Sequence, residues 1–310
     1  MNILMTGATG LVGTALVKKF TAEGHSIYRL TRTETGTRAA VEAGVFDVPW
    51  NSSSGEIGDF SVSSSGQMPT NVDAVINLAG APVVGGRWTE ERKALLRSSR
   101  VETTRGLVKA MAKMNPRPKV LLSASAIGYY GDRGEEVVTE KSEPGSDFLA
   151  ELAKEWESEA LQAEVLGVRV VLLRFGIILA KQGGALPAMM MPIKLGLGGK
   201  LGSGRQWTSW IALQDVVAII DAALHGEDWR GPVNFVAPGA ARNSDFTKSL
   251  AKVMHRPAIF AVPGFVLKLA MGEMAETLLG GVRVAPRALE QRGYPFLHAN
   301  LEEALKAILG

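Results

Sequence analysis

The chain has 310 residues, of which 46% are hydrophobic and 21% are charged, so it can build a core and lacks the composition of a disordered protein. Its 34 Lys and Arg residues nearly balance 31 Asp and Glu residues, and the net charge of +3 without a basic run argues against nucleic-acid binding. The absence of cysteine excludes disulfides and thiolate sites, and the four widely separated histidines predict no metal centre.

No apolar run approaches the roughly 18 residues that a membrane-spanning helix needs, so we expect no membrane span. The sequence opens directly on an apolar strand pattern, with no signal sequence before it. We therefore expect a cytoplasmic protein, or a plastid one if a transit peptide has been removed.

The first half of the chain alternates short apolar runs with helical stretches, which is the pattern of a parallel sheet with crossover helices. The predicted strands are 2–5, 27–31, 73–78, 119–123 and 169–175. The predicted helices are 11–23, 89–114 and 147–166, the second with Thr89 as its N-cap. Residues 51–70 are rich in Ser and Gly and predict a loop.

After residue 180 the pattern changes. Residues 183–206 are dense in Gly and Met, contain two prolines, and are expected to leave the sheet and wrap a cleft instead of forming a regular crossover unit. Further elements are predicted at about 213–225 (helix), 232–236 (strand) and 244–254 (helix), with a last helix at the end of the tail.

The predicted fold class is therefore α/β, a Rossmann-type doubly wound parallel sheet with a smaller C-terminal substrate-side domain. We assign the Rossmann domain to residues 1–180, with sheet elements returning around 210–240. Residues 181–310 form a mixed substrate-side region, and its small C-terminal domain spans about 256–310.

The strongest motif is MTGATGLVG at residues 5–13, between a predicted strand and a predicted helix. Gly7 permits a tight turn, Gly10 lets the backbone approach a pyrophosphate, and Gly13 lets the helix pack closely on the sheet. The helix N-terminus then offers free N–H groups to the phosphates. The alternative is a tight turn without a ligand, but the strand before and the helix after favour a dinucleotide site.

The end of the second predicted strand indicates which dinucleotide binds. An acid there would bind the free ribose of NAD, whereas an arginine suits the 2′-phosphate of NADP. The chain has Thr31 and Arg32 at this point, and Arg32 follows Gly13 by 19 positions. NLAG at 77–80 places small residues at the end of the third strand, where the adenosine half can lie against the backbone. We predict NADP(H); the alternative for Arg32 is a solvated surface arginine.

With TGATGLVG, NLAG and SASAIGYYG in this order, the chain resembles the extended and atypical short-chain dehydrogenase/reductases. It is most similar to an epimerase-like subgroup whose bacterial members are often labelled cell-division-inhibitor proteins. The resemblance implies bound NADP(H) and a substrate cleft closed by the C-terminal part. The cofactor-binding positions that it implies, together with the motif glycines, are Gly7, Ala8, Thr9, Gly10, Leu11, Val12, Gly13, Thr31, Arg32, Leu78, Ala79, Gly80 and Arg100. The alternative for Arg100 is a salt bridge.

Ordinary members of this superfamily use Ser, Tyr and Lys, of which the Tyr transfers a proton and the Lys lowers its pKa. Ser125 fits the serine position, after the fourth predicted strand. The Tyr-x-x-x-Lys pair is absent from FLAELAKEWE, because its two positions fall near Leu149 and Ala153 and the nearby Lys154 has no tyrosine four residues before it. The usual acid/base mechanism is therefore not expected.

Tyr129 and Tyr130 follow Ser125 closely, so we name Ser125 and Tyr130 as candidate catalytic residues, with a structural role for both tyrosines as the alternative. Two interpretations are open for Arg205, Trp207 and Trp210. They either shape a pocket for a polar, anionic substrate or pack the small domain on the large one. The acids expected to be solvated are Glu135, Glu136 and Glu140.

The leading hypothesis is an NADP(H)-binding, epimerase-like oxidoreductase with an unknown small-molecule substrate. The alternative is a non-catalytic NADP(H)-binding protein that regulates a protein partner in cell or organelle division.

Overall fold

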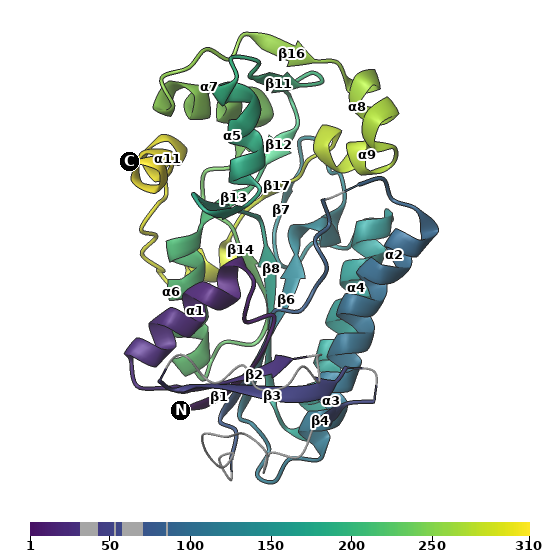
Figure 1. Cartoon of the computed structure of the whole chain (residues 1–310), viewed down its shortest axis with the longest axis vertical. Helices are drawn as coiled ribbons and strands as arrows, with labels where there is room; N and C mark the ends of the chain where they lie inside the picture. The colour runs from purple at the N-terminus through teal and green to yellow at the C-terminus, as the bar shows by residue number, and fades with distance from the viewer. Residues whose placement is uncertain (32–42, 53, 58–70, 85) are drawn as a thin grey trace.

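A sheet with the strand order β14-β8-β6-β5-β1-β2-β3-β4 runs through the lower lobe of the molecule (Figure 1). The structure is a computed structural model that describes residues 1–31, 43–52, 54–57, 71–84 and 86–310. The strands are β1 (Asn2–Thr6), β2 (Ser26–Thr31), β3 (Val45–Asn51), β4 (Glu56–Ile57), β5 (Ala74–Asn77), β6 (Val120–Ala126), β8 (Arg169–Phe175) and β14 (Gly231–Phe235). Every neighbouring pair is parallel except β3 with β4, so the predicted Rossmann-type parallel sheet is confirmed.

Helices cover both faces of this sheet, which is why its central strands are continuous apolar runs. Successive side chains of a strand point to opposite faces. In β1, Ile3 and Met5 pack in the core beneath α1 (Leu11–Ala22) and α6 (Leu213–His225). Leu4 packs in a second core with residues of α3 (Thr103–Ala112) and α4 (Phe148–Leu161).

The predicted long helix over 89–114 is not one unbroken α-helix. Thr89 caps it as predicted, accepting a hydrogen bond from the backbone N–H of Arg92. It then consists of α2 (Glu90–Arg97), a π-helix at Ser98–Glu102, and α3. The hydroxyls of Ser98 and Ser99 donate to carbonyls of the preceding turn and so compete with the regular backbone ladder.

Several elements were not predicted from the sequence, among them β3, α5 and, inside the loop expected at 51–70, β4. The strand β3 contains Pro49, a residue that argues against a strand, yet β3 pairs with β2 over Val45–Pro49. The segment 183–206, expected to be irregular, contains α5 (Leu186–Lys194), which begins with a proline in its first turn and buries Leu186, Met190 and Ile193. Of the loop predicted at 51–70, residues 58–70 lie outside the described residues.

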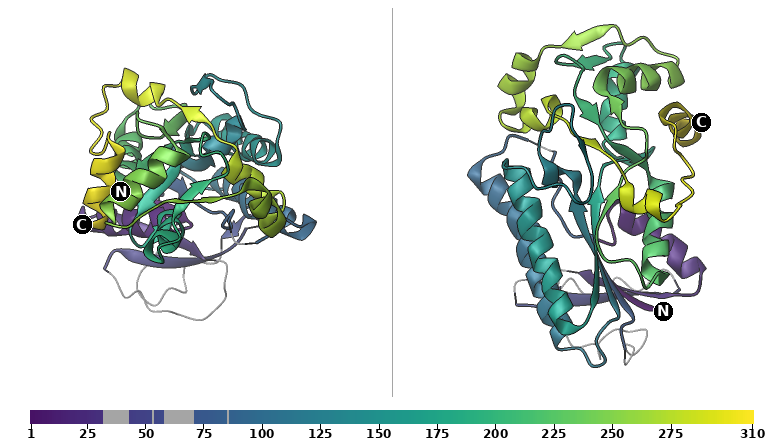
Figure 2. Two further views of the ribbon diagram at one scale, coloured as in Figure 1. Left: turned by 90° about the horizontal axis from the view of Figure 1, so that it is seen from above. Right: turned by 180° about the vertical axis from the view of Figure 1, so that it is seen from behind.

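The upper lobe, which we call the cap, lies beyond the carboxyl ends of β6 and β8, as the right-hand view in Figure 2 also shows. Its strands form small sheets and ribbons: β10-β9-β13 (Gly183–Gly184, Ile177–Ala180, Trp210–Ala212), β11 with β16 (Gly199–Leu201, Phe260–Val262), β12 with β15 (Trp207–Thr208, Ala241–Arg242), and β17 with β7 (Arg283–Val284, Val137–Val138). Its helices are α5, α7 (Asn243–Val253), α8 (Gly264–Met271), α9 (Met274–Leu279) and α11 (Leu301–Leu309), whereas α10 (Arg287–Gln291) packs against β14 and the core beneath α1 and α6. Among the described residues, no helix has the length and apolar character needed to cross a membrane.

Candidate functional site

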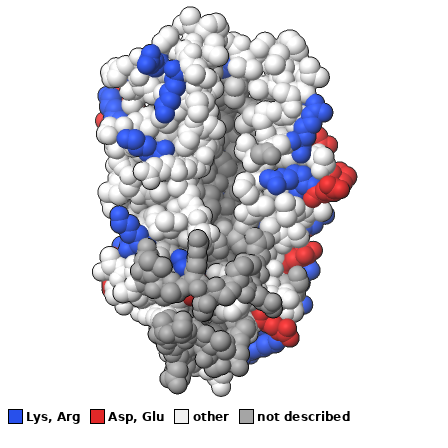
Figure 3. Space-filling model, viewed as in Figure 1, with Lys and Arg blue, Asp and Glu red and all other residues white. Residues whose placement is uncertain are grey.

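A groove runs down the middle of the face seen in Figure 1, between the side that carries α1 and α5 and the side that carries α2, α8 and α9 (Figure 3). On the right-hand side, polar contacts join the α8–α9 part of the cap to α2 and the residues just before it. The guanidinium of Arg87 donates to the carbonyls of Leu269 and Ala270 at the end of α8, and Lys93 of α2 pairs with Glu273 at 2.6 Å.

The glycine motif forms a turn between β1 and α1 that no larger residue fits. Gly7 has a φ of +65°, and a Cβ added to it would lie 2.4 Å from the carbonyl oxygen of Leu78. A Cβ on Gly13 would lie 2.3 Å from the carbonyl oxygen of Gly7. The N-cap of α1 is Gly10, which has no side chain to occupy the first N–H groups of the helix. The turn therefore has the shape and the free donors of a phosphate-binding site.

Buried hydrogen bonds fix the NLAG segment beside this turn. The Thr6 hydroxyl donates to Oδ1 of Asn77 at 2.7 Å and accepts from the backbone N–H groups of Leu78 and Ala79. The side-chain amide of Asn77 donates to the hydroxyls of Thr104 and Ser123. Sequence reasoning missed Thr6 and Asn77, because their partners lie on strands and helices far apart in the chain.

The π-helix places Arg100 against the NLAG segment. Its guanidinium donates to the carbonyls of Ala81 (2.9 Å) and Leu96 (3.2 Å), lies 3.1 Å from where a Cβ on Gly80 would be, and stacks over Trp156. Burial, with a smaller effect of nearby Arg92, lowers the pKa of Arg100 to about 10, so the group stays charged at neutral pH. Arg100 has no carboxylate partner within the described ranges, contrary to the salt bridge considered as its alternative. A half-buried cation of this kind, without a carboxylate partner, suits an anionic ligand.

The other expected cofactor contacts lie at the end of β2. The Thr31 hydroxyl reaches the carbonyl of Val48 at 3.5 Å, in a half-buried position. Arg32 lies outside the described residues.

Ser125 is 2% exposed, and its hydroxyl donates to Oε1 of Glu157 at 2.6 Å. Glu157 in turn accepts hydrogen bonds from Nε and Nη2 of the Arg174 guanidinium, at 2.8 and 2.7 Å. Burial alone would lower the pKa of Arg174, but its hydrogen bonds to Glu157 and the charge of that carboxylate raise it. The proton of Ser125 is therefore directed to Glu157 and is not free to polarise a substrate carbonyl.

Tyr130 belongs to the same network and is fully enclosed, with 0% of its surface exposed. Its hydroxyl donates to Oδ1 of Asn234 at 2.6 Å and accepts from Nη1 of Arg174 at 2.9 Å. Burial raises its pKa to about 12. Tyr129 stacks on the Arg174 guanidinium, 3.6 Å from the ring centre. This geometry matches the structural alternative for Tyr130, because its enclosed hydroxyl is bound to Asn234 and Arg174.

Glu140 also differs from the solvated residue expected, because its Oε1 accepts the backbone N–H groups of Asn234 and Ala288. It thereby links the loop after β6 to the sheet and the C-terminal tail.

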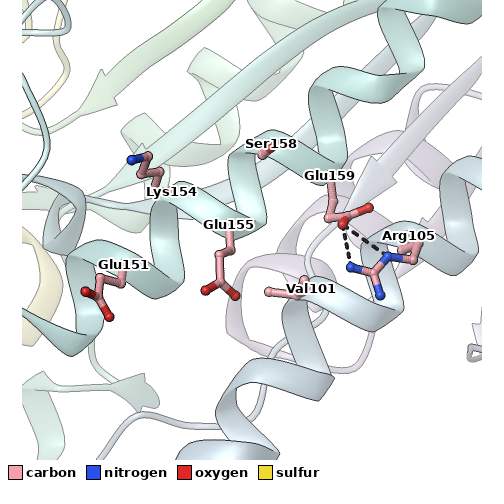
Figure 4. Close-up of a pocket in the computed structure, with 7 residues that line it drawn as sticks. All are labelled: Val101, Arg105, Glu151, Lys154, Glu155, Ser158 and Glu159. Carbon is pink, nitrogen blue, oxygen red and sulfur yellow. Dashed lines mark hydrogen bonds and ion pairs between the residues drawn. The ribbon is translucent and has the colours of Figure 1, made fainter.

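Lys154 points away from this network. It is exposed and lines a shallow pocket on the outer surface of α4 and the neighbouring helix, where Arg105 and Glu159 form an ion pair at 2.6 Å (Figure 4). The pocket is lined by Val101, Arg105, Glu151, Lys154, Glu155, Ser158 and Glu159. None of the candidate catalytic or cofactor-binding residues lines it, so we assign it no part in the site.

The sequence matches two family models. Residues 3–234 match the NAD-dependent epimerase/dehydratase family, and residues 262–308 match a domain of unknown function, DUF1731. Among curated proteins, Epimerase family protein YfhF of Bacillus subtilis is 37% identical over 310 residues, covering 100% of this chain and 98% of that protein. Epimerase family protein SH2119 of Staphylococcus haemolyticus is 38% identical and covers 99% of each chain.

Solved structures agree with these matches. Human epimerase family protein SDR39U1, crystallised with NADPH, is 31% identical with a TM-score of 0.85 over 99% of each chain. A nucleoside-diphosphate sugar epimerase from Corynebacterium glutamicum is also 31% identical, with a TM-score of 0.76 over 100% of this chain and 58% of that one. UDP-glucose 4-epimerase of Thermus thermophilus, solved with NAD, is 18% identical with a TM-score of 0.76 and shares the fold.

Proposed function

Because this chain belongs to the NAD-dependent epimerase/dehydratase family, we propose that it binds NADP(H) and acts as an oxidoreductase on a small molecule. The observation that carries the proposal is the uncapped N-terminus of α1 behind a glycine turn that a Cβ would fill. When bound, the nicotinamide ring would give or take a hydride. The presence of NADPH in the human relative's structure supports the choice of this cofactor.

Different residues of the chain would bind different parts of the dinucleotide. Residues 7–13 would hold the pyrophosphate through backbone N–H groups. Leu78, Ala79 and Gly80 would lie along the adenosine half, and Arg100 would supply a fixed positive charge to a phosphate. Thr31 and Arg32 would receive the 2′-phosphate that distinguishes NADP from NAD.

Proton transfer must differ from that of relatives with a Tyr/Lys pair. Leu149 and Ala153 stand at those positions, and neither side chain can transfer a proton. Ser125 donates to Glu157, so towards a ligand its oxygen serves as a hydrogen-bond acceptor. We propose that any proton is supplied by the substrate or by water.

The same observations favour a second candidate, an NADP(H)-binding protein without turnover. The names of the compared relatives speak of epimerases and none mentions division, so the regulatory role in cell or organelle division gains no support from them.

Cofactor titration tests the proposal directly. NADPH and NADH are titrated by fluorescence into the wild type and Arg32→Ala. A charge-assisted contact of about 1.5–3 kcal/mol predicts a preference for NADPH of roughly 10- to 150-fold, which Arg32→Ala removes. Lys154→Ala is the matched control, because that exposed cation lies in the outer pocket. Equal affinities in the wild type would refute the NADP assignment, and NADPH consumption in a screen of carbonyl substrates separates the enzyme from the silent binder.

A further inference from the structure

Two helices of the cap leave apolar faces open to solvent. Apart from Lys194, every residue of α5 is apolar, and the helix buries only Leu186, Met190 and Ile193, in a core shared with α7 and α11. Except for one glycine and one lysine, every residue of α8 is apolar, yet α8 has no buried residue. Helices that are apolar all round are usually buried on every side, so both exposed faces are suited to an apolar ligand or partner.

The exposed face of α5 is a regular stripe. Ala188, Met191, Pro192 and Leu195 follow the spacing i, i+3, i+4 and i+7, which puts them on one side of the helix. All four residues are exposed, Met191 by 58% and Leu195 by 68%. Figure 1 shows α7 and α11, which pack on the core side of α5, on the side away from α8. The stripe on the opposite side of α5 therefore borders the groove.

The stripe begins beside the proposed cofactor site. Gly183 and Gly184 precede α5, and a Cβ added to them would lie 3.0 and 3.1 Å from the methyl carbons of Leu11. Leu11 is the first residue of α1, directly after the glycine turn. From Ala188 to Leu195 the stripe then extends for about 10 Å, at about 1.5 Å per helical residue. An apolar chain that starts at the cofactor can lie along α5.

The exposed apolar surface continues across the top of the groove. Leu197 follows α5 and is exposed, and nearby Gly199 of β11 pairs with Phe260 of β16, which is also exposed. The next element is α8, where Phe265 and Leu269 lie four residues apart on one face and are 73% and 74% exposed. Figure 3 shows few charged side chains on the groove walls in this part of the cap. Contiguous exposed apolar surface of this kind marks a binding site.

The place of this surface favours a small molecule over a flat partner. The α5 stripe lies along a groove, and its first residues adjoin the segment that packs on α1. A membrane or the surface of another protein would reach α8 and the top of the cap, but not the end of the stripe beside the cofactor. A ligand chain inside the groove can contact both walls at once, as ligands in concave apolar sites do.

We propose that the stripe of α5, the β11–β16 ribbon and α8 bind the aliphatic chain of an amphipathic substrate, either a straight acyl chain or a branched isoprenoid chain. The polar, reacting end of the substrate lies at the cofactor end of the groove, and the chain runs along α5 towards α8. Binding removes apolar surface of the chain and of both helices from water. The inference names the substrate class of the proposed oxidoreductase and rests on that function.

Displacement of the neutral fluorescent probe N-phenylnaphthylamine from the cofactor-free protein measures chain binding. Hexanol, octanol and decanol displace the probe, and the affinity rises about 4-fold for each added methylene, which corresponds to about 0.8 kcal/mol per buried CH₂. Geraniol is a branched alcohol with as many carbons as decanol, so the tighter of these two ligands identifies the isoprenoid or the acyl chain. Saturation with NADPH does not weaken the alcohols, because the two sites adjoin without overlapping.

Variants locate the chain along the stripe. Met191→Gln weakens both hexanol and decanol, whereas Leu195→Gln and Leu269→Gln, farther from the cofactor, weaken decanol about 10-fold and hexanol less. These side chains are exposed, so the fold is kept and the circular dichroism spectrum is unchanged. Val165→Gln is the matched control, because Val165 is an exposed apolar residue in the short helix after α4, and it changes no affinity.

Equal affinities for the three straight alcohols, competition between decanol and NADPH, or unaltered decanol binding in Leu195→Gln and Leu269→Gln would overturn the site. A dimer in light scattering that Leu195→Gln dissociates would instead make a second copy the occupant. Flotation with phosphatidylglycerol and phosphatidylcholine vesicles that Leu269→Gln abolishes would make it a membrane. The proposed function fails separately, when the wild type binds the alcohols with the expected dependence on chain length but does not bind NADPH.

Discussion

The ion pair between Glu157 and Arg174 is buried in the lower lobe. Their side chains are only 7% and 3% exposed, and the pair also binds the hydroxyls of Ser125 and Tyr130. Replacement of Glu157 by Leu leaves the Arg174 charge buried without a counterion, which typically costs about 3–5 kcal/mol. The hydroxyl of Ser125 also loses its acceptor, which adds about 1–3 kcal/mol. We expect Glu157→Leu to lower the free energy of unfolding by about 4–8 kcal/mol, a large share of the roughly 5–15 kcal/mol that stabilises a typical domain.

Urea denaturation followed by circular dichroism measures this loss, provided that the m-value is unchanged. The double variant Glu157→Leu/Arg174→Met removes both charges and recovers most of the loss, because well-packed apolar residues can replace a buried ion pair at little cost. Glu155→Leu, two residues before Glu157 and in an exposed ion pair with Arg97, is the matched control and changes stability little. A loss below about 1 kcal/mol in Glu157→Leu, or a double variant no more stable than the single one, would refute the reasoning.

Three other predictions concern the cofactor site and the network. Arg100→Ala weakens NADPH about 10-fold or more in a fluorescence titration with unchanged circular dichroism, and an unaltered affinity would exclude the phosphate contact. Gly13→Ala forces its Cβ against the carbonyl of Gly7, so both cofactor affinity and thermal stability fall; a variant with normal values would show that the turn can relax. Burial raises the pKa of Tyr130 to about 12. The contribution of this neutral hydroxyl to the free energy of unfolding is therefore complete below about pH 10 and is lost as the pH rises through about 12. Tyr130→Phe should therefore lose less stability than the wild type over that interval in alkaline denaturation, and parallel curves would count against this assignment.

Features that depend on local sequence could be predicted, and features that depend on distant partners could not. The strand–glycine–helix pattern identifies β1 and α1, and a threonine followed by two glutamates places the start of α2 correctly at Thr89. The residues FLAELAKEWE also show without a structure that α4 carries no tyrosine. These inferences need only residues a few positions apart.

The remaining features of the site and the fold could not be predicted, because they depend on contacts between residues far apart in the chain. Ser125 was assigned to the catalytic serine position because it follows the fourth predicted strand. Its hydroxyl donates to Glu157, a partner 32 residues further along the chain. Tyr130 was a candidate because it follows Ser125 closely. Its hydroxyl donates to Asn234, which lies 104 residues further along the chain. The strand β3 was not predicted at all; it contains Pro49, which argues against a strand, yet it pairs with β2 over Val45–Pro49.

The π-helix between α2 and α3 sets the rotational phase of the chain that follows it. A π turn takes in one residue more than an α turn, which amounts to about 100° of rotation for everything after Glu102. That rotation brings Thr104 inward, where its hydroxyl accepts hydrogen bonds from Asn77 and Trp156. Removal of a single residue from Ser98–Glu102 would rotate the Thr104 hydroxyl away from Asn77 and Trp156. Two buried donors would then be unpaired. The length of this segment is therefore constrained in addition to the identity of Arg100, so that a one-residue gap here would be far more damaging than most substitutions.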